Sequence, residues 1–382
     1  MSLSRQDLFD IAAWRQALHR RPELSGAEAG TAAMAAEALR AAGAAEVISG
    51  LGGHGVAGLF PGAAPGPTVL FRAELDGLPI LEASGVPHAS EIAGRAHACG
   101  HDGHMAILAG LARALGRRPP ARGRAVLLFQ PAEEDGSGAA AVIADPRFAA
   151  LAPDLAFACH NMPGLPLGTA SIAAGPANCA SAGMRIVLAG RTAHASAPET
   201  GTSPMPALAR LMPGLTALGR GGPLDAGFSL VTVTHASLGE ACFGVAPGQA
   251  ELWCTLRTLT DDRMAALRSA AEALAREAAE AAGLALAIAY RDVFGHCDNA
   301  PEATSAWRRA LDAEGVPHGT ALFPMRASED FGRFGRLAPA AMVLLGAGED
   351  GPALHNPEYD YPDALTETGA RLFIRLARDL LG

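Results

Sequence analysis

The segment His-Ala-Cys-Gly-His-Asp-Gly-His at residues 97–104 constrains this chain more than any other. It places histidine, cysteine and aspartate side chains together in one short stretch. An apolar core does not accommodate this mixture, because each buried polar group would need a hydrogen-bond partner. Cysteine thiolate and neutral imidazole are side chains that bind Zn²⁺ and its first-row neighbours. The segment therefore indicates a metal site, for which other parts of the chain must supply further ligands.

Composition narrows the class of protein. A chain of 382 residues, 49% of them hydrophobic, predicts two domains with substantial cores. The formal net charge of −9 argues against a nucleic-acid or anionic-membrane partner. Six scattered cysteines favour free thiols in a cytoplasmic protein over a disulfide scaffold. We find neither a signal peptide nor an apolar run of about 18 residues, so we expect no membrane span.

Short apolar runs alternate with helical patterns in the first half of the chain. Strands are expected at 69–73 and 125–129 with a helix at 103–115 between them, and a further strand at 155–159. Strand, helix, strand is typical of an α/β domain with a mostly parallel sheet. The other elements expected in this domain are helices at 4–18, 26–43 (with Ser25 as N-cap), 307–314 and 365–381 and a strand at 341–345.

The pattern changes near residue 182, where alternating strands and amphipathic helices begin. The expected strands are 182–188, 229–236, 250–256 and 284–290, and the expected helices are 205–218 and 262–282. This order predicts an α+β sandwich, 182–293, inserted into an α/β domain made of 1–181 and 294–382. An exposed sheet edge on the insertion would allow pairing of two copies, so we expect a homodimer or a higher homo-oligomer.

Side chains of metal-ligand type follow the predicted strands at four separate places. They are the pair Cys99 and His101, the pair Glu133 and Glu134, His160, and His355. Loops beyond the carboxyl ends of parallel strands converge on one crevice, so these residues can meet there. A single histidine at such a junction is more often structural, but the four places together favour ligation.

The acidic turn and two other residues leave alternatives open. One carboxylate of Glu133 and Glu134 can bind metal while the other accepts a proton from water, although a solvated acidic turn is common. His194, in a turn of the insertion, is either exposed or a donor that stabilises an oxyanion. Cys99 could instead be a catalytic nucleophile paired with a histidine. We rank this alternative lower, because a Cys–His dyad does not need the two flanking histidines and the distant pair of glutamates.

Taken in order, these segments resemble the metal-dependent amidohydrolases that include hippurate hydrolase, N-acyl-amino-acid amidohydrolases and indole-acetyl-amino-acid hydrolases, within the aminoacylase and carboxypeptidase superfamily. The resemblance covers essentially the whole chain. It is carried by the segments 19–25, 71–80, 97–104, 130–134, 328–331 and 355–357. It implies a catalytic α/β domain interrupted by an inserted lid or dimerisation domain.

The resemblance also implies roles for individual residues. The ligands of a two-metal centre would be Cys99, His101, Glu134, His160 and His355. Glu133 would be the general base, and the carboxylate of Asp76 would support the site. The substrate, a small molecule, would meet His194 and Asn161, and Arg257 either meets a substrate carboxylate or is structural. Two divalent ions (Mn²⁺, Zn²⁺, Co²⁺ or Ni²⁺) are expected, and whether Cys99 contacts one or both is open.

The expected reaction is hydrolysis of the amide bond of N-acyl amino acids, with Glu133 taking a proton from water and returning it to the leaving amine. The alternatives are a dipeptidase or carboxypeptidase on the same fold, and a non-catalytic protein that closes two domains on a ligand. The chain departs from its relatives at Glu74, where Asp is usual, and at 244–247, where Gly-Val-Ala-Pro replaces Asn-Val-Ile-Pro. The second change removes an amide that could contact substrate.

Overall fold

The computed structural model describes residues 3–382, and their contacts divide the chain into two units. The first unit comprises residues up to Ala177 together with Cys297–Phe323 and Asp330–Gly382. The second comprises Asn178–His296 and Pro324–Glu329. The short segment joins the second unit because the backbone N–H of Cys179 donates to the carbonyls of Met325 and Ala327, at 3.2 and 3.1 Å.

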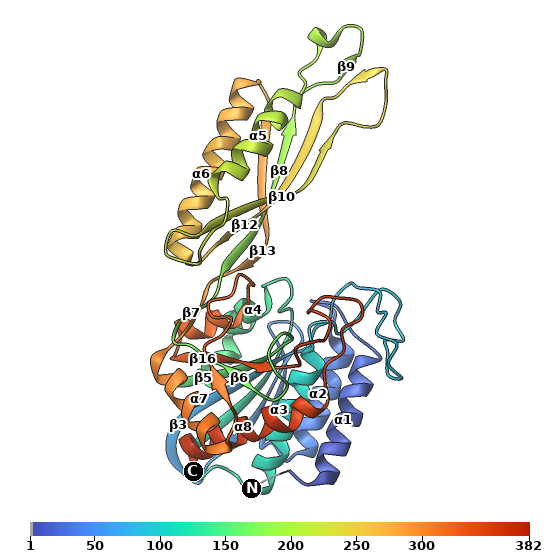
Figure 1. Ribbon diagram of the computed structural model, residues 1–382. Coiled ribbons are helices and arrows are strands. Elements are labelled where there is room, and N and C mark those ends of the chain that lie inside the picture. The colour runs from blue at the N-terminus through green and yellow to red at the C-terminus, as the bar shows by residue number, and fades with distance from the viewer. Residues whose placement is uncertain (1–2) are drawn as a thin grey trace. The chain divides into compact units, whose positions relative to one another are not determined.

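The first unit is built on an eight-stranded sheet in the order β1-β2-β4-β3-β5-β16-β6-β15 (Figure 1). Its central strands β4, β3, β5 and β16 are parallel, whereas β1 and β2 form an antiparallel edge that the sequence did not predict. The strands are β1 (Glu46–Leu51), β2 (Gly55–Pro61), β3 (Ala64–Glu74), β4 (Arg122–Gln130), β5 (Leu155–Met162), β6 (Ala170–Ser171), β15 (His318–Gly319) and β16 (Ala340–Gly346). A large, mostly parallel sheet confirms the expected fold class.

Both faces of this sheet are buried, which explains why its strands read as continuous apolar runs. Along β3, Phe71 points to one face and joins a core cluster with helices, as Phe157 of β5 does. Leu70, which points to the opposite face, and Leu128 are buried outside that cluster. The helices in that cluster are α1 (Arg5–His19), α2 (Ala29–Ala41), α3 (His101–Arg117), α7 (Pro301–Glu314) and α8 (Ala364–Leu381). The remaining elements are α4 (Gly138–Ala144), η1 (Pro146–Leu151), η3 (Phe331–Arg336) and the short pair β7 (Gly175–Asn178) and β14 (Cys297–Asn299).

The second unit is an antiparallel sheet, β10-β12-β8-β13, with two helices packed on one face (Figure 1). Residues that alternate along β8 and β12, such as Ile186 and Leu252, point into the helices, which is why these strands read as half-buried. Its elements are β8 (Ala180–Ala189), β9 (Ala193–His194), η2 (Pro198–Thr200), α5 (Met205–Leu218), β10 (Ser229–Leu238), β11 (Val245–Ala246), β12 (Gln249–Thr258), α6 (Asp261–Ala281) and β13 (Ala285–Phe294).

The start of α2 differs from the sequence-based expectation. Glu28, not Ser25, is the N-cap residue, and the helix begins at Ala29. The hydroxyl of Ser25 instead donates to a carboxylate oxygen of Asp76 at 2.7 Å. Ser25 is therefore committed to a tertiary contact, which a local capping pattern cannot reveal.

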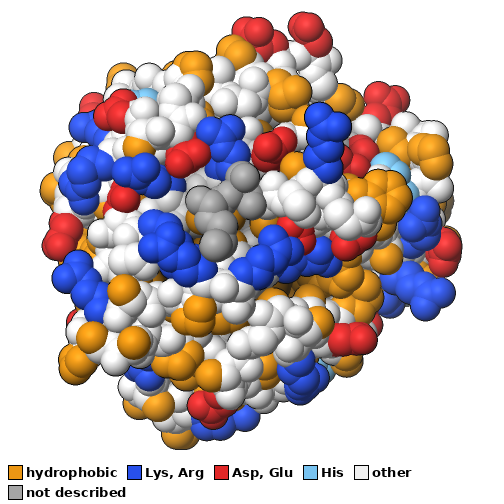
Figure 2. Space-filling view, turned by 90° about the horizontal axis from the view of Figure 1, so that it is seen from below, with side chains coloured by type: hydrophobic (Ala, Val, Ile, Leu, Met, Phe, Trp, Pro, Cys, Tyr) orange, Lys and Arg blue, Asp and Glu red, His pale blue; other side chains and the backbone are white. Residues whose placement is uncertain are grey.

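No helix within residues 3–382 is long and apolar enough to cross a membrane. On the face of the protein seen in Figure 2, arginine side chains lie among aspartate, glutamate and apolar side chains, so charges of both signs are interspersed there. On the first unit, Arg113 and Arg117 both pair with Asp7, which shows the same mixing at the level of single contacts.

Burial predicts which of two phenylalanines stabilises the first unit. Phe157 is fully buried and its ring stacks on Phe71, whereas Phe9 is 70% exposed. We expect Phe157→Ala to lower the free energy of unfolding by about 3–5 kcal/mol, because it leaves a cavity. Phe9→Ala should change it by less than about 0.5 kcal/mol. Urea denaturation of both variants checks this, and equal losses would contradict the assigned core.

Candidate metal centre

The predicted donor residues meet at the carboxyl edge of the parallel sheet. Asp76 lies just beyond β3, Glu133 and Glu134 just beyond β4, and His160 near the end of β5. The Cys99–His101 segment leads into α3, which begins at His101. Its N-cap, Gly100, has a φ of 85°, and a Cβ there would lie 2.3 Å from the Asn161 side-chain oxygen, so only glycine fits.

Six side chains of metal-ligand type lie close enough together to hold ions in common. Their ligand atoms form three overlapping groups, each within 4.8 Å: Cys99, His101 and His160; Cys99, Glu134 and His355; and His101, Glu133 and Glu134. The Cys99 Sγ lies 3.6 Å from His160 Nε2, and His355 Nε2 lies 3.5 Å from a Glu134 oxygen. The structure thus brings together all five expected ligands and Glu133.

The donor spacing fits a metal ion better than direct hydrogen bonding. His101 Nε2 is buried and has no hydrogen-bond partner among residues 3–382. It lies 3.9 Å from one oxygen each of Glu133 and Glu134, which is too long for a hydrogen bond. Ligands about 2.0–2.3 Å from a tetrahedral ion are separated by about 3–4 Å, which matches these distances.

The pKa values of two donors reflect their burial and their neighbours. Burial lowers the pKa of His101, but the Cys99 sulfur and the Asp76 carboxylate outweigh it and raise that pKa well above its usual value. Burial, and then the Glu134 carboxylate, raises the pKa of the Cys99 thiol. A divalent ion bound by these two groups would displace their protons.

Asp76 joins the segments that carry these donors. One of its carboxylate oxygens accepts from the Ser25 hydroxyl at 2.7 Å and from the Glu134 backbone N–H at 3.0 Å. His101 Nδ1 lies 2.9 Å from the Asp76 carbonyl oxygen. With its proton on Nδ1, the ring presents Nε2 as a ligand, as histidines backed by an oxygen acceptor commonly do.

The ring of His104 supports the end of β5. Its Nε2 accepts the Asn161 backbone N–H at 3.1 Å, so its proton lies on Nδ1, which is 2.7 Å from a Glu74 oxygen. His160 Nδ1 faces the Asn161 carbonyl at 2.8 Å, which leaves Nε2 towards Cys99. Burial lowers the pKa of His160 to about 3, so the ring stays neutral and able to bind metal.

The expected substrate-binding residues have different surroundings. Asn161 is 1% exposed and its amide donates to the Tyr359 hydroxyl at 2.7 Å, which gives it a structural partner. His194, in the second unit, is exposed and accepts from the Ser196 backbone N–H at 3.1 Å. Arg257, in the same unit, donates to the Arg326 carbonyl at 2.6 Å and the Ser328 hydroxyl at 2.7 Å. Their roles towards substrate stay predictions.

Sequence reasoning missed several supporting residues, among them Ser25, Glu28, His104 and Tyr359. Each acts through a partner far away in the chain, as the Asn161–Tyr359 contact shows. The only signal for Ser25 was its position in the 19–25 segment that carries the family resemblance. Nothing local distinguished Glu28 from an ordinary helix-start glutamate.

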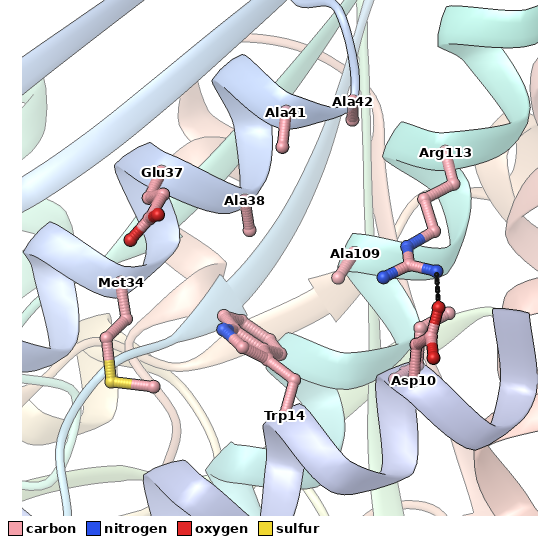
Figure 3. Close-up of a pocket in the computed structure, with 10 residues that line it drawn as sticks. Asp10, Trp14, Met34, Glu37, Ala38, Ala41, Ala42, Ala109 and Arg113 are labelled. Atoms are coloured by element: carbon pink, nitrogen blue, oxygen red, sulfur yellow. Dashed lines mark hydrogen bonds and ion pairs between the residues drawn. The ribbon is translucent and has the colours of Figure 1, made fainter.

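A separate cavity of about 430 Å³ lies between α1, α2 and α3 (Figure 3). Trp14 and Met34 point into it, and Arg113 pairs with Asp10 at its side, with their closest atoms 3.3 Å apart. None of the donor residues lines it. This cavity is therefore distinct from the candidate metal centre.

Comparison with known proteins gives consistent matches. The profile of peptidase family M20/M25/M40 matches residues 70–379. Thermostable carboxypeptidase 2 of Saccharolobus solfataricus is 30% identical over 352 residues, covering 90% of this chain and 88% of that protein. Hippurate hydrolase of Campylobacter jejuni is 29% identical over 366 residues, covering 95% and 94%. The crystal structure of the Bacillus subtilis YXEP protein, described as a dinuclear metal-binding peptidase of the M20 family, has a TM-score of 0.82 at 26% identity and covers 99% of both chains.

Thiol reactivity separates metal binding from the nucleophile alternative. Cys99 is buried and its thiol pKa is raised, whereas Cys242 is exposed. In chelator-treated protein we expect one fast thiol, which Cys242→Ser removes, and a Cys99 that reacts at least about 100-fold more slowly. A second fast thiol that Cys99→Ser removes would instead support a nucleophilic cysteine.

A buried histidine behind the site predicts a pH dependence of stability. Burial lowers the pKa of His19, but Asp102, at 2.8 Å, outweighs it and raises that pKa to about 9. The protonated ring therefore stabilises the fold below pH 6.5, and this contribution is lost as the pH rises through 9. Relative to His19→Gln, the wild type should lose about 3 kcal/mol of unfolding free energy over that range. A pH-independent difference in urea denaturation would contradict this.

Proposed function

The chain belongs to peptidase family M20/M25/M40, and from this premise we propose that it hydrolyses the amide bond of N-acyl amino acids or related small conjugates. The observation that carries the proposal is the convergence of Cys99, His101, Glu134, His160 and His355 beside the carboxylate of Glu133. Among the relatives, hippurate hydrolase covers nearly the whole chain. The family assignment favours hydrolysis over a purely ligand-binding role.

Two divalent ions are the proposed cofactors. Cys99 belongs to two of the three donor groups, one with His101 and His160 and the other with Glu134 and His355. His101 and Glu134 also belong to two groups each, so these three side chains link the groups to one another. Bound ions would polarise the substrate carbonyl and lower the pKa of water. Mn²⁺, Zn²⁺, Co²⁺ and Ni²⁺ all accept this mixture of N, O and S ligands.

Glu133 is the proposed general base. It is buried, follows β4 directly and lies beside the donors without being needed in either group that contains Cys99. Its carboxylate would take a proton from the attacking water and return it to the leaving amine. Asp76 would keep His101 and Glu134 in register during this exchange.

His194 is proposed to stabilise the oxyanion, and its surroundings suggest how substrate choice is set. Its strand, β9, pairs with β11, where Val245 lies opposite His194. The Gly-Val-Ala-Pro segment thus lies directly beside His194, and the neighbouring Phe243 side chain is fully exposed. Arg257 remains the proposed contact for a substrate carboxylate, alongside its hydrogen bonds within the second unit.

A carboxypeptidase or dipeptidase activity is the second candidate. It is favoured by the carboxypeptidase relative, which is 30% identical over 90% of this chain. The two activities differ in whether the substrate carries an acyl cap or a free amino group. Comparison of N-acyl amino acids with unblocked dipeptides decides between them.

Assembly and location follow as further proposals. Strand β10 lies at an edge of the second unit's sheet, and its second half is exposed, so two copies could pair there as a homodimer. All six cysteines are free thiols, which supports a cytoplasmic location.

The role of Glu133 is tested by removing its basicity alone. We expect Glu133→Gln to bind the same number of ions and to lose at least about 100-fold in kcat, because the amide cannot accept the proton from water. The matched control is Asp135→Asn in the same turn, which should keep wild-type kcat since its carboxylate accepts the N–H of Ser137, two residues further on, at 2.9 Å. Wild-type turnover by Glu133→Gln would show that the base is assigned wrongly.

A further inference from the structure

Glu28 is a fully buried carboxyl group that the proposed chemistry does not use. It occupies the N-cap position of α2, yet its side chain makes no capping hydrogen bond. One oxygen instead accepts two backbone N–H groups, from Gly26 at 2.9 Å and from Ala132 at 2.8 Å. Ala132 directly precedes Glu133, so a side chain at the start of α2 contacts the backbone of the acidic turn.

Ala132 needs such support because its backbone is in a costly conformation. Its φ is 49°, in the left-handed region, which disfavours residues with a Cβ. Its carbonyl oxygen accepts the Gly138 N–H at 2.9 Å, and its N–H is the group that Glu28 binds. With both polar groups of its backbone held, Ala132 sets the direction in which Glu133 and Glu134 leave the strand.

The surroundings of Glu28 show that it is not part of an ion pair. Its second oxygen is buried and has no hydrogen-bond partner in residues 3–382. Burial, with a smaller contribution from Asp76, raises the pKa of Glu28. A neutral carboxyl group still accepts both N–H groups through its carbonyl oxygen. Burial of a carboxyl group with one unpartnered oxygen lowers the stability of the fold. Because this group is hydrogen-bonded to the turn that carries Glu133 and Glu134, we look for its role at that turn.

We propose that Glu28 is a positioning residue, which holds the Ala132 amide so that the turn at 131–138 presents Glu133 to water and Glu134 to the metal ions. The inference rests on the proposed function of those two glutamates. The same short segment also supplies Ser25, which binds Asp76. Residues 25–28 thus support both carboxylate-bearing loops, from a part of the chain that precedes the matched family region, 70–379.

A purely structural role for Glu28 predicts something different, and Glu23 provides the matched control. The Glu23 carboxylate accepts the Thr31 N–H at 2.7 Å and the Thr31 hydroxyl at 3.0 Å. It therefore supports the start of the same helix without a hydrogen bond to the turn at 131–138. If Glu28 merely anchored α2, changes at Glu23 and Glu28 would have the same consequences.

The test compares Glu28→Leu, Glu28→Gln and Glu23→Leu in the full-length, metal-saturated protein. Leucine fills the space of Glu28 without an acceptor, and glutamine keeps a neutral acceptor; Glu28→Met replaces the leucine variant should that not fold. Four measurements are made: hydrogen exchange of the Ala132 amide, the affinity of chelator-treated protein for Mn²⁺ by titration, the kinetics of N-benzoylglycine hydrolysis (kcat and KM), and thermal unfolding.

In Glu28→Leu we expect Ala132 exchange to rise at least about 10-fold, because its amide loses its acceptor. We expect kcat to fall about 10- to 100-fold with KM within about 2-fold, since misplacement of the base affects the reacting geometry. Glu28→Gln should stay within about 3-fold of the wild type in every measurement. Glu23→Leu should lower thermal stability while leaving kcat and Ala132 exchange unchanged.

Unchanged Ala132 exchange and unchanged kcat in Glu28→Leu would overturn the proposal. So would a loss of kcat in Glu23→Leu equal to that in Glu28→Leu, or a Glu28→Gln variant that does not retain activity. A wild-type protein without turnover under any metal would count against the proposed function instead. In that case Ala132 exchange alone decides whether Glu28 holds the turn.

Discussion

The hydrogen bonds made by the side chain and backbone of the buried residue Asp76 are the interactions on which the candidate centre depends. Through Ser25, His101 and the backbone of Glu134, this one residue joins three segments that are far apart in the sequence. Burial alone would raise the pKa of Asp76, but the contacts with His101, Glu134 and Ser25 lower it overall. Asp76 therefore remains charged, and a charge held by several donors in a medium of low dielectric constant keeps its neighbours in one geometry.

The centre as a whole brings two carboxylates and one thiol close together. Glu133, Glu134 and Cys99 lie with the neutral ring of His160 at the sheet edge. His101 carries a positive charge when it is protonated, and a bound metal ion would displace that proton. Buried charges are strongly destabilising unless they are paired or bind a cation. A divalent ion bound by this donor set would be stabilising, and metal binding should contribute to the stability of the first unit.

Much of this arrangement could be predicted from the sequence, and the remainder could not for identifiable reasons. The apolar runs around residues 71, 127 and 157 are buried on both faces, so their pattern indicated a parallel sheet and placed the following donors at one edge. The antiparallel edge, β1 and β2, carries a weaker pattern because β1 is largely exposed. The beginning of α7 at Pro301 was missed because proline reads as a helix breaker, although it is well tolerated at the first helical position.

The supporting contacts lay beyond local patterns altogether. Glu28 and Ala132, like Ser25 and Asp76, are neighbours only once the sheet has assembled. Asn161 has a partner of the same kind, because its side-chain amide donates to the hydroxyl of Tyr359, which is far away in the sequence. Sequence motifs thus indicated which atoms could bind metal, and tertiary structure was needed to show what orients them.

The central claim is that this donor set makes the chain a metal-dependent hydrolase of capped amino acids. Its most direct test strips the protein with chelator, reloads it separately with Mn²⁺, Zn²⁺, Co²⁺ or Ni²⁺, and measures amino acid release from N-acyl amino acids and unblocked dipeptides. The account predicts release that depends on added metal and is faster from the N-acyl substrates. Two ions bound per chain without turnover of either class, or turnover that survives complete metal removal, would contradict it.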